Sequence, residues 1–253
     1  MSALAGRVAL VTGSSRGIGA AIARLFAREG AAVAVHGRDA AAAAAVRAAI
    51  ERDGGRAVDV TADVTRFDEI ERMRERVEAS LGPIDVLVAN AGASLTPPHA
   101  AVEELSEEGW RASVDANLTA TFLTLKSVLP GMKARGRGSI VTLSSAAARR
   151  PTDRSPAPYA AAKAGVQTLT QIVAAQAGPF GVRVNCLAPE TILTERTSRQ
   201  IPAELQTRLA GEHPVRRLGT PDDVADAALY LASDASAWVS GVVLDVAGGA
   251  VLR

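Results

Sequence analysis

The stretch "APYAAAKAG", residues 157–165, places a tyrosine and a lysine four positions apart in a chain that has only two tyrosines and three lysines. If this stretch is helical, the side chains of Tyr159 and Lys163 lie on the same face. A phenol has a pKa of about 10, which is too high for proton transfer at neutral pH, and a neighbouring ammonium group favours the phenolate. The spacing therefore predicts that Tyr159 is a general acid–base for a carbonyl or alcohol oxygen, assisted by Lys163.

A glycine-rich loop, "TGSSRGIG", follows the first apolar run and opens directly into a helical pattern. Backbone amides at the start of a helix attract anions, and glycines let a pyrophosphate approach closely. The spacing is Gly-x-x-x-Gly-x-Gly, and a tight turn that binds nothing is the alternative. The flanking strand and helix favour a dinucleotide site. The predicted cofactor contacts in the loop are Gly13, Ser14, Ser15, Arg16, Gly17, Ile18 and Gly19.

A serine at the end of a later apolar run, "IVTLSS", adds a hydrogen-bond donor. The hydroxyl of Ser145 could bind the substrate oxygen and stabilise the charge that develops there. Taken singly, these side chains have structural interpretations, because a tyrosine packs, a serine caps a helix and a lysine is solvated. Their joint placement at strand ends around a dinucleotide loop favours the catalytic interpretation.

The end of the second predicted strand distinguishes NAD(H) from NADP(H). An NAD site usually carries an acid about 20 residues after the loop to hold the ribose 2′-hydroxyl, but here Gly37 is followed by Arg38, and the first carboxylate is Asp39. Arg16 adds a second cation, and guanidinium groups bind phosphate in a bidentate manner. We therefore predict NADP(H) in preference to NAD(H), with solvated arginines as the alternative.

Short apolar or β-branched runs alternate with helical patterns along the chain, which predicts parallel strands joined by right-handed crossovers. The expected fold class is α/β, a single domain over residues 1–253 with a doubly wound (Rossmann) parallel sheet of about seven strands flanked by helices. The least regular segment, about residues 190–220, is a candidate lid, because ligands bind beyond the carboxyl ends of such strands. The predicted strands cover 7–13, 31–37, 56–64, 84–92, 138–145, 182–189 and 241–246, and the helices 17–30, 40–50, 66–82, 107–134, 159–177 and 221–233.

Composition argues against several other classes of protein. The net charge of +1 gives no electrostatic reason to expect nucleic acid or a membrane as partner. The single cysteine, Cys186, excludes an internal disulfide and lies in an apolar run, and His36, His99 and His213 have no metal-ligand spacing. No signal pattern or membrane-spanning run is present, so we expect a cytoplasmic protein without a metal.

The motifs together resemble the short-chain dehydrogenase/reductase family over nearly the whole chain, in particular its 3-oxoacyl-acyl-carrier-protein-reductase-like branch. The glycine loop or the tyrosine–lysine pair alone would be weak support, whereas the full set in family order is specific. The matching stretches are "TGSSRGIG", "ADV" at Asp63, "ANAG" at Asn90, "NLTATF" at Asn117, "SS" at Ser144 and Ser145, "YAAAK", "NCLAP" at Asn185, and "RLGTPDDVADAALYLASDASAWVSG" near the end.

This resemblance implies roles for individual residues. Tyr159 would be the catalytic acid–base, Lys163 would bind the nicotinamide ribose and lower the pKa of the tyrosine, and Ser145, preferred over Ser144, would orient the substrate carbonyl. Asn117 would support a water molecule in a proton relay. The family also implies a homotetramer acting on a small carbonyl or alcohol substrate. The further cofactor contacts that it implies are Asp63, Val64, Asn90, Ala91, Gly92, Pro189, Ile192 and Thr194.

The chain departs from the family pattern in two places. Pro189 is followed by Glu190 instead of the usual glycine, and this carboxylate would either contact a cationic or polyhydroxylated substrate or point to solvent. Phe180 stands where acyl-carrier-protein reductases tend to carry a basic residue. Nearby cations could still attract an anionic substrate or carrier, with solvated side chains as the alternative; they are Arg149, Arg150 and Arg154.

Two alternatives to an NADP(H)-dependent carbonyl reductase or alcohol dehydrogenase remain. A non-catalytic NADP(H)-binding sensor or scaffold would be expected to lose a member of the set Asn117, Ser145, Tyr159 and Lys163, all of which are present. A methyltransferase would not need the tyrosine–lysine pair. No pattern identifies the substrate in the segments that would select it, which are 94–99, 147–155 and 190–213.

Overall fold

Seven parallel strands form one sheet in the computed structural model, which describes residues 2–95, 100–153 and 155–252. Their order is β3-β2-β1-β4-β5-β6-β7, which confirms the predicted doubly wound fold. The strands are β1 (Val8–Val11), β2 (Ala32–His36), β3 (Arg56–Val60), β4 (Val86–Ala89), β5 (Gly138–Leu143), β6 (Val182–Pro189) and β7 (Val243–Val246).

The strand order reverses between β1 and β4, because β1 pairs with β2 on one side and with β4 on the other. Every residue of β1 and β4 is buried, as expected for central parallel strands covered on both faces. Such a reversal leaves a crevice beyond the carboxyl ends of the strands, where dinucleotides bind in folds of this kind.

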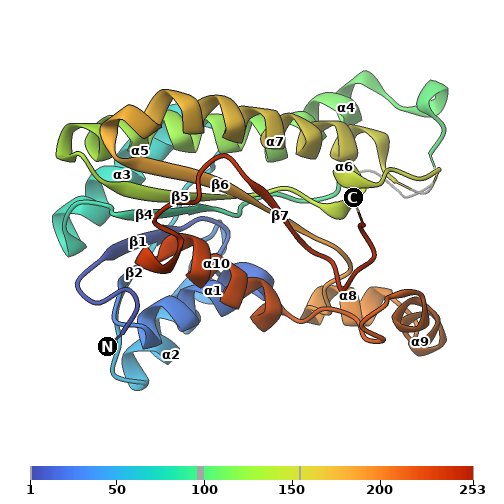
Figure 1. The fold of residues 1–253 in the computed structure, drawn as a ribbon, viewed down its shortest axis with the longest axis horizontal. Helices are drawn as coiled ribbons and strands as arrows, with labels where there is room; N and C mark the ends of the chain where they lie inside the picture. Colours follow the sequence, from blue (N-terminus) through green and yellow to red (C-terminus); the bar gives the residue numbers. More distant parts are fainter. Residues whose placement is uncertain (1, 96–99, 154, 253) are drawn as a thin grey trace.

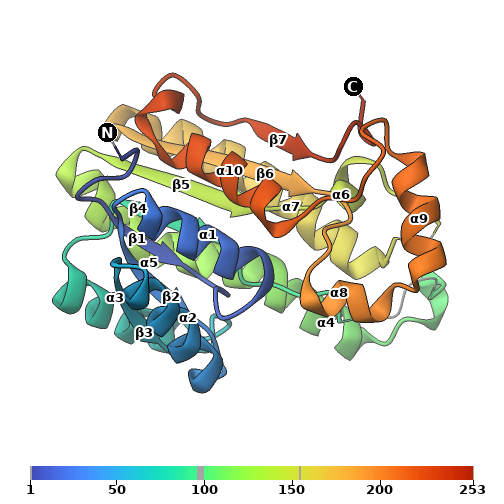
Figure 2. The ribbon, with the colours of Figure 1, turned by 90° about the horizontal axis from the view of Figure 1, so that it is seen from below.

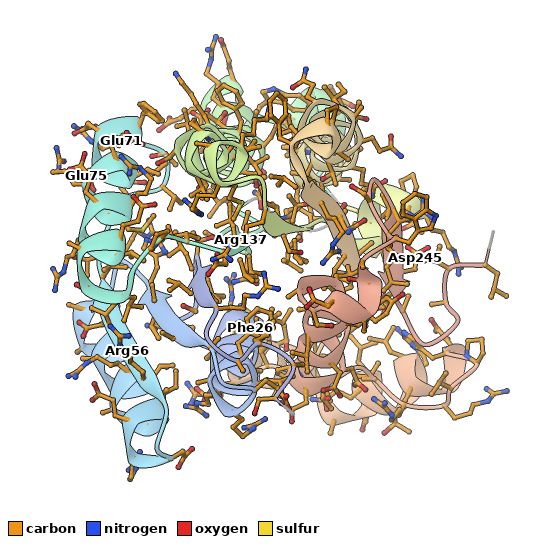
Figure 3. All side chains as sticks on the ribbon, turned by 60° about the vertical axis from the view of Figure 1, so that its left-hand side comes forward. Phe26, Arg56, Glu71, Glu75, Arg137 and Asp245 are labelled. Carbon is orange, nitrogen blue, oxygen red and sulfur yellow. The ribbon has the colours of Figure 1, made fainter. Side chains whose placement is uncertain are left out.

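Helices cover both faces of the sheet (Figure 1). One layer holds α1 (Gly17–Arg28), α2 (Ala40–Arg52) and α10 (Pro221–Ala232), and the other holds α3 (Phe67–Leu81), α5 (Ala120–Arg135) and α7 (Ala157–Ala177). Each layer buries its own apolar cluster against the sheet. Phe26 from α1 belongs to the first cluster (Figure 3), and Met132 from α5 belongs to the second. The starts of α1 and α7 carry the glycine loop and the predicted catalytic tyrosine.

The predicted helix over 107–134 is interrupted. Helix α4 (Glu107–Val114) leads into a π-helical turn, Asp115–Thr119, and α5 continues from there. The sequence therefore predicts helix correctly on both sides of the interruption and misses the π turn. Because a π turn holds one more residue than an α turn, it changes the direction of side chains locally. Asn117 lies in this turn and is fully buried.

The candidate lid is more regular than its sequence indicates. It contains α8 (Glu195–Gln200) and α9 (Ala203–Glu212), and Figure 2 shows both beyond the end of the sheet to which the strands point. A further short helix, α6 (Ala146–Arg149), precedes α7 and was not predicted. The remaining short 3₁₀ turns are Val102–Glu104, Gly178–Phe180 and Asp234–Ser236. Within the described ranges, no helix combines the length and the apolar character needed to cross a bilayer.

Candidate active site

The glycine loop between β1 and α1 approaches the segment after β4 so closely that side chains would not fit. A Cβ on Gly13 would lie 2.9 Å from the Cα of Ala91, and one on Gly19 would lie 2.4 Å from the carbonyl oxygen of Gly13. Gly17 has a φ of +58°, a conformation that favours glycine. No side-chain cap occupies the N-terminus of α1, so its first amides remain available to an anion.

The side chains of Asn90 and Thr12 hold the loop in place, a role that the sequence did not indicate. Asn90 Nδ2 donates to the carbonyl oxygens of Thr12 at 2.9 Å and Gly13 at 3.1 Å. The hydroxyl of Thr12 accepts from the amides of Asn90 and Ala91, both at 3.1 Å. Asn90, a predicted cofactor contact, therefore binds the backbone of the glycine loop. Thr12 gave no signal beyond its position directly before the first glycine.

His36, at the end of β2, joins three strand ends. Its Nδ1 accepts from the Gly13 amide at 3.0 Å, so its Nε2 carries the proton and donates to the carbonyl of Ala62 at 3.0 Å. Burial lowers the pKa of His36, which agrees with this neutral form. The buried Ser14 hydroxyl donates to the carbonyl of Val11 and accepts from the His36 amide. Hydrogen bonds within the chain thus hold the loop to the ends of β1, β2 and β3.

The two predicted phosphate-binding arginines have different surroundings. Arg38 is exposed and makes no ion pair with any other described residue. Arg16 Nη2 lies 2.8 Å from Asp39 Oδ2, so the pocket is not as free of acid as the sequence suggests. However, Asp39 Oδ1 accepts from the amide of Ala42 and caps α2 as well. Both carboxylate oxygens of Asp39 are therefore occupied by partners within the chain.

Asp63 and Val64 follow β3 at the same edge of the sheet. Asp63 Oδ1 accepts from the Thr65 amide at 2.9 Å and the Thr65 hydroxyl at 2.7 Å. These two hydrogen bonds lower the pKa of Asp63. The carboxylate is therefore used locally to shape the turn after β3, and Val64 beside it is half-buried.

Tyr159 and Lys163 lie in the first turns of α7. The Lys163 ammonium is buried, lies 5.6 Å from the centre of the Tyr159 ring, and donates to the carbonyl of Leu143 at 2.7 Å. The hydroxyl of Ser144 donates to the carbonyl of Lys163 at 2.8 Å. Ser144 thus holds the backbone of the lysine, a role that sequence reasoning missed. Burial lowers the pKa of Lys163 to about 8.

Ser145 begins α6 and caps it by accepting from the Ala147 amide at 3.2 Å. Its side chain also forms a hydrogen bond with Tyr159. Burial raises the pKa of Tyr159, and the bond to Ser145 only partly opposes this effect. The predicted lowering of the Tyr159 pKa depends on a bound nicotinamide as well as on Lys163. A bound nicotinamide in its positively charged form would add an attraction for the phenolate.

Asn117 presents an unpaired acceptor to the same region. Its Nδ2 donates to the carbonyls of Ser113 and Ala93, both at 2.8 Å, whereas its Oδ1 is buried and has no hydrogen-bond partner in the described chain. A Cβ on Gly92 would lie 2.6 Å from this Oδ1 and 3.2 Å from Lys163 Nζ. The absence of a side chain at Gly92 therefore leaves a polar space between the amide oxygen and the ammonium.

The segment after β6 lies next to the glycine loop. A Cβ on Gly17 would lie 3.4 Å from the Thr194 methyl group, and Ile192 is buried. Pro189 is the last residue of β6. The next residue, Glu190, neither points freely to solvent nor has an unoccupied carboxylate. One of its oxygens accepts from Thr191 and from His213, and the other from the Thr191 hydroxyl.

The predicted basic cluster before Tyr159 is also engaged. Arg149 forms two parallel hydrogen bonds to Asp245 on β7, each at 3.0 Å (Asp245 is labelled in Figure 3). Arg150 donates to the carbonyl of Ala250 at 2.8 Å. Arg149 is therefore neither a solvated side chain nor a free anion-binding group. Arg154, like His99, lies outside the described residues.

A nicotinamide dinucleotide fits this arrangement. The uncapped start of α1, the crowded glycines and the unpaired Asn117 Oδ1 form one continuous edge with Tyr159 and Lys163. Over the described ranges, no group of three His, Cys, Asp or Glu side chains is arranged to hold a metal ion.

Comparison with known proteins gives consistent matches. The family model described as enoyl-(acyl carrier protein) reductase matches residues 13–251. Cis-4-hydroxycyclohexanecarboxylate dehydrogenase of Sinomonas cyclohexanicum is 42% identical over 247 residues, which are 98% of this chain and 97% of that protein. The 7α-hydroxysteroid dehydrogenase of Escherichia coli K12 is 36% identical over 248 residues, with 98% and 95% coverage.

A solved structure of a 7α-hydroxysteroid dehydrogenase, complexed with NADH and 7-oxo glycochenodeoxycholic acid, superimposes with a TM-score of 0.92. The two sequences are 36% identical, and the match covers 99% of this chain and 96% of that one.

Proposed function

The chain belongs to the short-chain dehydrogenase/reductase family and is an oxidoreductase of that family, and on this premise we propose that it transfers hydride between NADP(H) and a carbonyl or alcohol substrate with Tyr159 as general acid–base. The observation that carries the proposal is the convergence of Tyr159, Ser145, Lys163 and Asn117 beside the glycine loop. Four side chains from α6, α7 and the π turn meet there.

Each side chain has a part in moving a proton. In the direction of reduction, the Tyr159 hydroxyl gives its proton to the carbonyl oxygen, and the Ser145 hydroxyl donates a hydrogen bond to the same oxygen. Lys163 would hold the ribose of a bound cofactor and provide positive charge near the phenolate. The unpaired Asn117 Oδ1 holds a water molecule that returns a proton towards Lys163 and Tyr159. When bound, the cofactor supplies or accepts the hydride.

The preference for NADP(H) rests on Arg38. It is exposed at the end of β2, and both oxygens of the nearby Asp39 have partners, so no carboxylate is open to a ribose 2′-hydroxyl. Arg16 can share its guanidinium between Asp39 and a phosphate. The solved relative with bound NADH makes NAD(H) the competing choice.

The names of two of the relatives suggest a substrate class. These two are named for a compound that bears a secondary hydroxyl group on a saturated ring, cis-4-hydroxycyclohexanecarboxylate in one case and a 7α-hydroxysteroid in the other, whereas D-threitol dehydrogenase and gluconate 5-dehydrogenase, 37% and 38% identical to this chain, are named for open-chain polyols and sugar acids. We therefore propose cyclic secondary alcohols and the matching ketones for this protein. The Lys133 ammonium lies 4.8 Å from the centre of the Phe180 ring. The cation that an acyl carrier protein could bind on this surface is therefore already in contact with an aromatic ring.

We also propose a homotetramer. Large apolar side chains are exposed on two faces, one formed by α5 and α7 and the other near β7, and exposed apolar patches mark interaction surfaces. Phe122 and Ile172 are 47% and 50% exposed on the first face, and Tyr230 and Trp238 are 43% and 100% exposed near the second.

The decisive experiment is a steady-state assay of the purified protein with both dinucleotides. We expect turnover of 4-hydroxycyclohexanecarboxylate, of a 7α-hydroxysteroid or of a corresponding ketone, and a loss of about a thousandfold or more in kcat for Tyr159→Phe. Tyr159→Phe should still bind the dinucleotide, as measured by fluorescence titration. Tight cofactor binding without turnover on a broad carbonyl panel would favour the non-catalytic sensor.

The same assay tests the cofactor preference. The wild type should have the higher kcat/KM with NADPH, and Arg38→Asp should reverse the preference by placing a carboxylate where the 2′-phosphate would bind. A wild type that already prefers NADH would contradict this part of the proposal and leave the oxidoreductase assignment intact.

A further inference from the structure

Packing into the core does not explain how the lid is positioned. In the continuous, fully described stretch 193–217, every side chain except that of His213 is at least partly exposed, and neither α8 nor α9 has a buried residue. Three backbone hydrogen bonds tie the base of the lid to the rest of the chain, from Leu193 to Gly219 at 2.8 Å, from Gly219 to Thr191 at 3.1 Å and from Val215 to Gly248 at 3.1 Å. These bonds fix where the lid begins and ends. They do not fix where its two helices lie.

His213 supplies the missing attachment. Its ring follows α9 directly, with Nδ1 2.7 Å from the carbonyl oxygen of Leu209 in the last turn of that helix. Its Nε2 lies 2.6 Å from a carboxylate oxygen of Glu190, directly after β6. One buried ring therefore connects the end of the lid helix to the end of a core strand.

Both partners of this ring are acceptors. A carbonyl oxygen only accepts, and the two side-chain oxygens of Glu190 accept hydrogen bonds from the amide and the hydroxyl of Thr191. Only the doubly protonated imidazolium can donate to both partners, and loss of one proton removes one hydrogen bond. His36 shows the contrast, because it faces one donor and one acceptor and is satisfied as the neutral ring.

We propose that Glu190 and His213 are positioning residues whose ion pair holds α8 and α9 in place at the substrate end of the active site, so that substrate affinity depends on this pair. The proposal rests on the proposed function for its effect on catalysis, whereas the attachment itself stands on the contacts above. Neither residue touches the reacting atoms. The pair acts by keeping the lid in the position that closes on the substrate.

The other charged groups near His213 are already paired or favour the same protonation state. Glu212 precedes it on α9 and favours the imidazolium. The cavity of about 230 Å³ beside the pair is also lined by Arg217, Asp223 and Asp245. Arg217 is paired with Asp223, and Asp245 with Arg149. His213 is therefore the group in this cluster that changes charge near neutral pH.

The direction of the pH dependence follows from the partners of His213. Burial by itself lowers the pKa of His213, but the hydrogen bonds to Leu209 and Glu190, together with the negative charge of Glu190, outweigh it and raise the pKa. A raised histidine pKa means that the attachment is complete at low pH and is lost as the pH rises through that pKa. The lid should therefore loosen on the alkaline side.

The test compares wild type with His213→Gln and Glu190→Gln, and uses Glu204→Gln on the exposed side of α9 as the matched control. Hydrogen–deuterium exchange of amides in α8 and α9 should be faster in both test variants and unchanged in the control. In NMR titrations, the His213 pKa should lie above its ordinary value in the wild type and move down in Glu190→Gln. The chain has only three histidines, so assignment is direct.

Kinetics then separate positioning from a merely structural role. With cis-4-hydroxycyclohexanecarboxylate or a 7α-hydroxysteroid as the probe, KM should rise about tenfold in both test variants, while kcat and the Kd of the dinucleotide stay close to wild type. The wild-type KM should increase as the pH passes the His213 pKa, and this increase should be absent in His213→Gln.

An ordinary or lowered His213 pKa in the wild type would overturn the proposal, as would unchanged exchange in α8 and α9. Faster exchange with an unchanged KM would overturn the positioning role. A wild type without turnover on any carbonyl or alcohol would instead refute the proposed function, and the exchange and NMR measurements would still decide whether the ion pair anchors the lid.

Discussion

Lys163 carries its ammonium group in the protein interior, and only 4% of the residue is exposed. One carbonyl, that of Leu143, accepts from it, and burial brings its pKa down to about 8. The folded state therefore binds fewer protons at this site than the unfolded chain, in which the pKa is about 10.4. The proposed catalytic set thus includes a group whose protonated form is destabilising at neutral pH, a common feature of active sites.

The lowered pKa of Lys163 predicts a specific pH dependence of stability. Because the folded-state pKa is lowered, the free energy of unfolding should rise with pH between about 8 and 10.4. Relative to Lys163→Met, the wild type should gain about 1 kcal/mol between pH 7 and pH 9, measured by urea denaturation at both values. The exposed Lys126→Met variant is the control and should keep a constant difference from wild type. A constant difference for Lys163→Met would show that the buried lysine is not perturbed.

At the scale of elements, two helix starts shape the site. Helix α1 begins uncapped, which leaves its amides to the dinucleotide, whereas α10, which packs on α1, begins with a complete capping box. The Thr220 hydroxyl accepts from the Asp223 amide at 3.3 Å, and Asp223 accepts from the Thr220 amide at 2.7 Å. Arg217 donates twice to the same carboxylate. Helix α10, whose start is capped within the chain, therefore packs against α1, whose uncapped start faces the proposed dinucleotide site.

The cap of α10 should contribute to stability in two distinguishable ways. Thr220→Ala should cost about 1 kcal/mol at any pH, because it removes an uncharged acceptor. Asp223→Asn should cost about as much at pH 7. Hydrogen bonds from Arg217 and Thr220 lower the pKa of Asp223, so this stabilisation is present above about pH 4 and is lost as the pH falls through the lowered pKa.

Thermal unfolding at pH 7 and pH 3 measures both effects. The difference between wild type and Asp223→Asn should shrink at pH 3, and the difference for Thr220→Ala should not. If both variants lose the same stability at pH 7 and at pH 3, the contribution of Asp223 does not depend on its negative charge.

At the scale of the whole molecule, the sheet order and the two helical layers bring the site to one end and leave two apolar faces exposed. Figure 1 shows α5 and α7 in the same layer on one face of the sheet. Phe122 on α5 and Ile172 on α7 are exposed. Trp238 is fully exposed before β7, and Leu244 on that edge strand is 37% exposed. An edge strand with exposed apolar side chains can add to a second sheet.

The proposed tetramer predicts the mass in solution. Light scattering coupled to gel filtration should give four times the 26.0 kDa of one chain. Trp238→Ser should weaken the contact near β7 and give a species of half that mass, because the face on α5 and α7 remains intact. Lys126→Met should leave the mass unchanged. A monomeric wild type would refute the proposal.

The sequence by itself determined the parts of this protein that depend on local pattern. Alternating apolar runs and helical periods predict the strands and the doubly wound sheet, the glycine spacing predicts the loop, and Asp39 correctly predicts the start of α2. The set Ser145, Tyr159, Lys163 and Asn117 was also named from types, spacing and family motifs. The predictions of the sheet and of the start of α2 succeed because helix and strand periods and turn residues act over a few neighbouring positions, whereas the roles of the four side chains stay predictions.

Only the tertiary structure decided what depends on contacts between distant positions. It pairs Glu190 with His213, Arg149 with Asp245 and Arg16 with Asp39, across separations of 23, 96 and 23 residues. It also raises the pKa of Tyr159 by burial, with the hydrogen bond from Ser145 acting in the opposite direction, whereas the lower value predicted for Tyr159 depends on a bound, positively charged nicotinamide as well as on Lys163. Burial and long-range pairing set the protonation states, and no local pattern encodes either of them.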